Sequence, residues 1–283
     1  MRGAGNNTDF TGTTDETDTS GKLGLTWSPS DSSLVYATFS QGYKGPAFNV
    51  FYNQALENTL PISSESSEQI ELGYKLTTGN LFANFAIFTT DIEDLQANNI
   101  DTSLGTATTT LTNAGDISTE GLEVDFIWQP SANFQLTGGF AAITAEIDRF
   151  NCPVGVPATD CTDRSGLEVP FSPDLKYTLG ANYVLELASM DMIFDASFVH
   201  TDEQVSGLPG NNGEFAPQAF LPEYDIINAS VAFSWLDDKY RLTLIGKNLG
   251  DESYVTTFSG DGFRYQIPRD AERYFGVSLR ANF

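Results

Sequence analysis

The sequence predicts an all-β fold, an antiparallel up-and-down transmembrane β-barrel with short periplasmic turns and long extracellular loops. The first observation is an alternation of apolar and polar positions, as in Leu122, Val124, Phe126 and Trp128, which are separated by single residues, two of them acidic. Side chains of a strand point to opposite faces in turn, so such segments have one apolar and one polar face. The second observation is that short turn sequences alternate with long polar connections, as they do in membrane barrels.

About eleven strands are expected, which is half of a barrel of about 22 strands, since bacterial single-chain barrels have an even number. The expected strands are residues 21–28, 33–42, 66–76, 81–97, 108–128, 133–147, 172–185, 190–202, 223–235, 239–249 and 270–283. Residues 1–20 are polar and are expected to be a loop or the remnant of a preceding strand. We therefore expect residues 21–283 to be the C-terminal part of a larger barrel.

The composition excludes several classes of protein. The chain has 38 Asp+Glu against 14 Lys+Arg, a formal net charge of -24. Nucleic acid binding needs clustered positive charge, so no nucleic acid partner is expected. No run of about 18 apolar residues is present, which excludes a transmembrane helix. Aromatic residues make up 12% of the chain and apolar residues recur regularly, which is not typical of disorder.

Outer-membrane lipid is expected to contact the apolar faces of the strands. Tyr and Trp residues lie near several short turns, as they do at membrane interfaces. The residues expected to face lipid are Leu122, Val124, Phe126, Trp128, Val231, Phe233, Trp235, Phe275, Val277 and Leu279. The opposite faces carry charged residues, whereas a small soluble barrel would fill its interior with apolar side chains. A polar face therefore predicts a water-filled or polar lumen.

The two cysteines, Cys152 and Cys161, enclose a Pro- and Gly-rich segment. Outside the cytoplasm such a pair is expected to form a disulfide, and two unpaired thiols are the alternative.

His200 is the only histidine, and the cysteine spacing fits no zinc finger, so neither a metal site nor a cofactor is expected. By parity His200 lies at the rim of an apolar face. Nucleophilic catalysis needs a base beside the nucleophile, and His200 is the only candidate imidazole. Because His200 is expected at this rim, we expect it to lie at the membrane interface and not to be catalytic. The chain is therefore not expected to be an enzyme.

Several motifs occur in an order that resembles the C-terminal barrel half of TonB-dependent outer-membrane receptors. They are Gly42-Tyr43-Lys44-Gly45-Pro46-Ala47-Phe48-Asn49, Glu65 through Lys75, Asn113-Ala114-Gly115 followed by Gly121-Leu122-Glu123, Lys247-Asn248-Leu249 with Asp251 and Tyr254, and Pro268, Arg273 and Gly276 before the terminal Phe283. The resemblance extends from about Gly21 to Phe283. No segment resembles the plug domain or the TonB box of that family.

The resemblance implies energy-coupled uptake of a scarce solute across the outer membrane of a Gram-negative bacterium. The solute would be of the siderophore-iron, cobalamin or oligosaccharide class. TonB would act only through the plug region that the chain lacks. The resemblance also implies contact with lipopolysaccharide and with the barrel-assembly machinery, which in this family reads the last strand. Phe283 is the expected assembly signal, because an unpaired last strand can add to another sheet.

Ligand contacts are expected from aromatic and basic side chains of the long loops. The candidates are Tyr43, Lys44, Phe48, Tyr52, Phe215, Phe263, Arg264 and Tyr265. Aromatic rings suit sugars and chelate rings, and cationic groups suit anionic siderophores. The alternative for each residue is packing within its own loop.

Two other functions stay open at this level. The first is a complete, porin-like passive channel of about twelve strands, which would need a further strand from residues 2–12, although their Gly, Asn and Thr content disfavours one. The second is a soluble secreted β binding module, in which the alternating apolar faces would pack on each other.

Overall fold

The structure is a computed structural model. It describes residues 12–48, 61–101, 108–152, 159, 161–209, 215, 219–257 and 272–282. No helix within these ranges is long and apolar enough to cross a membrane.

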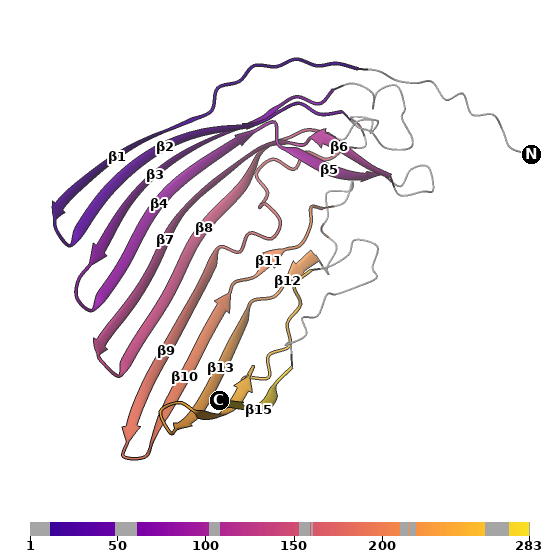
Figure 1. The fold of residues 1–283 in the computed structure, drawn as a ribbon. Helices are drawn as coiled ribbons and strands as arrows, with labels where there is room; N and C mark the ends of the chain where they lie inside the picture. Colours follow the sequence, from indigo (N-terminus) through magenta and orange to yellow (C-terminus); the bar gives the residue numbers. More distant parts are fainter. Residues whose placement is uncertain are drawn as a thin grey trace, which may run out of the picture.

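Eleven strands of the described residues form one antiparallel sheet (Figure 1). They are β1 (Gly21–Ser30), β2 (Ser33–Lys44), β3 (Glu65–Thr77), β4 (Leu81–Glu93), β7 (Gly115–Ser131), β8 (Phe134–Phe150), β9 (Leu175–Leu187), β10 (Met190–Thr201), β13 (Tyr224–Trp235), β14 (Tyr240–Lys247) and β15 (Tyr274–Ala281). The order in the sheet is β1-β2-β3-β4-β7-β8-β9-β10-β13-β14-β15, without a crossover, and β1 and β15 are its edges. The predicted fold class is confirmed, and the barrel is not closed in this structure.

The connections alternate in length as the sequence predicted. Short turns at residues 31–32, 78–80, 132–133, 188–189 and 236–239 lie together at the lower left of Figure 1. The described ends of the long connections, at 45–64, 94–114, 151–174, 202–223 and 248–273, lie at the opposite end. We call these the turn end and the loop end of the sheet.

The prediction of one continuous strand at 81–97 and another at 108–128 was wrong, because each of these strands is broken near the loop end. β5 (Gln96–Asp101) and β6 (Thr108–Asn113) form a separate hairpin above β4 and β7. The break lies at Asp94, with φ 53°, and Gly115, with φ 135°. A Cβ atom on Gly115 would lie 1.8 Å from the carbonyl oxygen of Arg149, so this bend requires glycine. A second short hairpin, β11 (Gln204–Val205) with β12 (Phe220–Leu221), lies within an expected loop.

The strand register separates an apolar face from a polar face over the whole sheet. Val124 lies opposite Phe85 on β4 and Phe140 on β8, and Val231 lies opposite Phe194 on β10 and Leu244 on β14. All ten residues expected to face lipid share this apolar face, although contact with lipid itself stays a prediction.

No second layer of described residues covers the apolar face. The buried hydrophobic residues among those described are few, and most of them are alanines. In contrast, Leu72, Ile87 and Leu179 on central strands are 47%, 52% and 49% exposed. A soluble module would bury such side chains between two layers, so the described part of the chain does not support that alternative.

Candidate functional site

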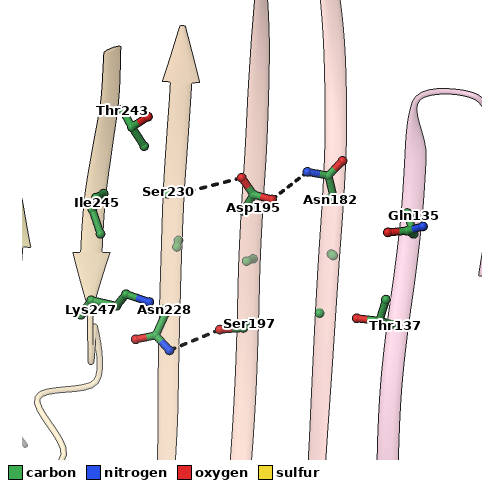
Figure 2. A pocket seen from close by; sticks show the side chains of 14 residues that line it. Gln135, Thr137, Asn182, Asp195, Ser197, Asn228, Ser230, Thr243, Ile245 and Lys247 are labelled. Carbon is green, nitrogen blue, oxygen red and sulfur yellow. Dashed lines mark hydrogen bonds between the residues drawn. The ribbon is translucent and has the colours of Figure 1, made fainter. Parts of the chain in front are cut away.

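The polar face of the sheet forms a wall of hydrogen-bonding side chains across β8, β9, β10, β13 and β14 (Figure 2). We call it the polar wall; it consists of Gln135, Thr137, Asn182, Asp195, Ser197, Asn228, Ser230, Thr243 and Lys247. The register puts these residues on one face, because Asn182 lies opposite both Gln135 and Asp195, and Asp195 lies opposite Ser230. They line a hollow of about 480 Å³.

Asp195 is the centre of the polar wall. One of its carboxylate oxygens accepts a hydrogen bond of 2.7 Å from Asn182 Nδ2, and the other accepts one of 3.4 Å from Ser230 Oγ. Asn228 Nδ2 donates to Ser197 Oγ at 3.2 Å on the same face. Such cross-strand hydrogen bonds fix the orientation of these side chains and leave further donors and acceptors available to a polar partner.

A second part of the polar face, on β2, β3, β4 and β7, is packed more tightly. A Cβ atom on Gly73 would lie 2.2 Å from the Tyr36 ring, so glycine makes room for that ring. The Lys75 ammonium lies 5.3 Å from the centre of the same ring, a cation–π distance. Asn84 Nδ2 donates to Asp125 at 3.0 Å, while Asn84 Oδ1 is buried without a partner among the described residues.

Arg149 ties three strand ends together at the loop end. Its guanidinium donates to both oxygens of Asp116, at 2.6 and 2.8 Å, and to Asp94 at 3.0 Å. The hydrogen bond from Arg149 lowers the pKa of the Asp116 carboxyl, although burial opposes this effect. A bidentate contact of this kind is stronger than an ordinary surface ion pair. The clamp therefore fixes the base of the β5–β6 hairpin.

Gln96, the first residue of β5, anchors a neighbouring connection. Its side-chain nitrogen donates to the carbonyl oxygens of Gly45 and Ser63, both at 2.9 Å. Its backbone N–H donates to Glu65 at 2.7 Å, and the Lys44 ammonium lies 3.8 Å from the same carboxylate. The described ends of the 45–64 connection are thus held against the β5–β6 hairpin.

The connection between β8 and β9 contains a disulfide between Cys152 and Cys161, with Cα atoms 5.9 Å apart. In the same connection Arg164 is only 9% exposed, and burial lowers the pKa of its guanidinium. Arg164 Nε and Nη2 donate to the carbonyl oxygen of Pro209 at 3.1 and 2.8 Å, and the guanidinium lies 4.6 Å from the Phe150 ring. Arg164 therefore joins this connection to the one that follows β10.

His200 lies at the loop end of β10, on the apolar face, as its parity predicted. It lies opposite Tyr177 on one side and Asp225 on the other. Its Nδ1 is 2.8 Å from Asp225 Oδ1, and its ring stacks on Tyr177 with centroids 4.8 Å apart.

Comparison with known proteins assigns the chain to a protein family. The family described as TonB dependent receptor-like, beta-barrel, matches residues 2–249. The chain belongs to this family. The resemblance seen in the sequence is therefore confirmed.

Solved receptors share the fold of the chain. The ferric yersiniabactin uptake receptor FyuA from Yersinia pestis has a TM-score of 0.73 and 21% identity, over 93% of this chain and 37% of that one. The ferric-catecholate import receptor Fiu from E. coli K12 has a TM-score of 0.68 and 21% identity, over 93% and 34%. The copper transporter OprC has a TM-score of 0.66 and 16% identity, over 92% and 39%. The chain thus spans little more than a third of the length of these proteins.

Within this receptor fold, the structure separates the expected ligand residues. Lys44 shares the polar face with Glu65, whereas Tyr43 lies on the other face of β2 and is 47% exposed. Phe215 packs on Phe220, with ring centroids 5.2 Å apart, and Phe48 is half-buried. Tyr52, Phe263, Arg264, Tyr265 and the expected assembly signal Phe283 lie outside the described residues.

Sequence reasoning did not select the residues of the polar wall as a site, although the alternation assigns such positions to a polar face. The available signal was their position between apolar residues, as for Asn182, which lies between Ala181 and Tyr183. Parity assigns the face but not the partner, because the bond from Asn182 to Asp195 depends on the register of two strands.

Proposed function

We propose that the chain supplies eleven strands of the barrel of an outer-membrane receptor that takes up a scarce solute with energy from TonB. The observation that carries this proposal is a single meandering sheet with one polar and one apolar face, in a chain that belongs to the TonB-dependent receptor family. The unpaired edges β1 and β15 are expected to bond to further strands of a larger barrel, because an open edge in hydrocarbon leaves backbone groups without partners.

Siderophore-bound iron is the solute class that we favour over cobalamin and oligosaccharides. It is supported by the functions of two proteins of similar structure, the uptake of ferric yersiniabactin by FyuA and the import of ferric catecholates by Fiu. The cationic side chains of Lys44 and Arg264 would attract an anionic chelate, and Phe48, Tyr52, Phe215, Phe263 and Tyr265 would pack against its rings. The copper transporter OprC shares the fold, so the loops rather than the sheet would determine the solute.

The two faces of the sheet would have different partners. Outer-membrane lipid would contact the apolar face, and lipopolysaccharide would surround its loop end. The polar wall would contact the plug domain of the complete receptor, since its upright amide and carboxylate groups suit hydrogen bonds with another polypeptide surface. TonB would then act through that plug, and the barrel-assembly machinery would bind β15.

The test is uptake of radioactive iron by cells that carry or lack the gene for this chain. A panel of ferric siderophores is supplied, and accumulation is measured with and without a protonophore. The proposal expects at least one chelate to accumulate only when both the gene and the membrane energy are present. Energy-independent uptake would instead support a passive channel, and the absence of gene-dependent uptake for every chelate in the panel would show that the solute class is wrong.

A pair of charge-removing variants tests the ligand site. Arg264→Ala should lower the apparent affinity for the chelate, whereas Lys239→Ala, at the turn end of the sheet, should leave it unchanged. Equal effects of the two variants would contradict a binding site formed by the loops.

A further inference from the structure

We propose that His200, Asp202 and Glu223 bind a divalent transition-metal ion on the outer, apolar side of the barrel wall. One potential ligand atom from each of these residues lies within 4.8 Å of the others. The site is on the opposite face of the sheet from the polar wall, so it is separate from any path that a transported solute takes through the lumen. It does not depend on the identity of that solute.

The register of two adjacent strands brings these residues together. His200 on β10 lies opposite Asp225 on β13, and the last registered pair of the two strands is Thr201 with Tyr224. Asp202 and Glu223 come directly after that pair. Because side chains alternate between faces, they share the face of His200 and Asp225. One imidazole and three carboxylates thus lie at the corners of one cross-strand square, where neighbouring Cβ atoms are about 5–7 Å apart.

The donor set fits a transition metal better than calcium or magnesium. Imidazole binds zinc, copper, iron and nickel, whereas calcium and magnesium are bound by oxygen ligands alone. Asp225 Oδ1 is 2.8 Å from His200 Nδ1, and a proton on Nδ1 leaves Nε2 free to bind a metal. A carboxylate behind the imidazole is the usual arrangement around metal-ligating histidines. The Tyr177 ring, stacked at 4.8 Å, holds the imidazole plane in place.

The charge of the square favours a cation. Three carboxylates, those of Asp202, Glu223 and Asp225, surround one imidazole, whose side chain is 14% exposed. Within the described ranges, no lysine or arginine forms an ion pair with any of the three. Like charges this close repel each other, and a bound divalent ion would reverse that repulsion.

The site lies at the loop-end rim of the apolar band. His200 is ten residues from Met190, which lies opposite Trp235 at the turn end. At about 3.3 Å per residue and a strand tilt of about 40°, ten residues rise about 25 Å, which is the height of the apolar band of such barrels. A metal ion here would join the ends of β10 and β13 at the base of the 202–223 connection.

The proposal is tested by titrating zinc into the purified protein in detergent micelles and measuring the heat of binding by calorimetry. Millimolar Mg²⁺ is present throughout, because the acidic loops would otherwise bind zinc without specificity. We expect one saturable zinc site that disappears in the double variant Asp202→Asn, Glu223→Gln. His200→Gln should also abolish it, and Asp225→Asn should weaken zinc affinity by about 10–100-fold, as loss of an orienting carboxylate does.

The matched control is Glu186→Gln with Asp191→Asn, a carboxylate pair on the same sheet, on the other face and near the turn end. This control should bind zinc like the wild-type protein. Zinc affinity that is unchanged in the double variant, or lost equally in the control, would overturn the proposal. X-ray absorption of the zinc-loaded wild-type protein gives an answer that does not depend on the variants folding. Imidazole scattering supports the site, and an all-oxygen shell refutes it.

Discussion

Val124→Arg is the sharpest test of which face of the sheet contacts lipid. Val124 lies on the apolar face of β7, between Phe85 and Phe140 of the neighbouring strands. On that face Trp128 lies toward the turn end, and Glu120 marks the first charged position toward the loop end. Val124 is midway between them, four residues from each, or about 13 Å along a strand. With a tilt of about 40°, this is about 10 Å along the membrane normal, close to the middle of an apolar band about 25 Å tall.

The expected cost follows from that depth. An arginine on the lipid face costs about 2–4 kcal/mol at the bilayer midplane and about 0–1 kcal/mol near the interfaces. A loss of 2 kcal/mol lowers the folding equilibrium constant about 30-fold. Leu122→Arg should cost less than Val124→Arg, since Leu122 is one step closer to Glu120 and to the rim.

The matched control is Glu123→Arg, one residue away on the polar face. We expect a change below about 1 kcal/mol there, because the side chain stays in a polar environment. Free energies of unfolding are measured by guanidinium titration of tryptophan fluorescence in phosphatidylcholine vesicles. Equal losses in Val124→Arg and Glu123→Arg, or a larger loss in Glu123→Arg, would refute the assignment of the two faces.

Two further predictions concern the loop end. Asp116→Asn should lower stability at neutral pH, because it removes the bidentate contact with Arg149. The pKa of Asp116 is lowered in the folded state, so its contribution is present above an unfolded pKa of about 3.9 and is lost as the pH falls through the folded value. Melting curves of the two proteins should therefore converge in acid, and a pH-independent difference would contradict this mechanism. Replacing Cys152 and Cys161 by serine should destabilise their connection by about 2–3 kcal/mol. Limited proteolysis should then cut residues 151–174 faster, and an unchanged rate would show that the disulfide adds nothing there.

Most of the sheet could be predicted from the sequence because its signal is local. Alternation along 10–17 residues determines both the strand and its faces, as in β7 and β13. The break between β4 and β5 could not be predicted in this way. Asp94 adopts a left-handed conformation, and the glycine that permits the opposite bend, Gly115, resembles any glycine in a strand. The need for it comes from the backbone of Arg149, which is distant in sequence.

The candidate sites depended even more on distant residues. His200 has a sequence context of apolar alternation, and its carboxylate neighbour Asp225 is 25 residues away. Their contact depends on the register of β10 and β13, which a change of one residue would destroy. Arg164 likewise gave no signal, since its partner is a carbonyl oxygen of another connection. Single-residue arguments could exclude a zinc finger here, but they could not find a site assembled across strands.

The crossover-free order of the sheet also has a consequence for how such proteins change size during evolution. Every strand bonds only to its neighbours in the order of the sheet, and every connection returns the chain to the end from which it left. A duplicated hairpin can therefore enter the meander without changing the direction or the face of any other strand. A single inserted strand would instead reverse the direction of every strand that follows it, and long loops would then lie at the turn end of the sheet. Circumference can thus grow in steps of two strands, and a wider lumen needs only the copying of one hairpin.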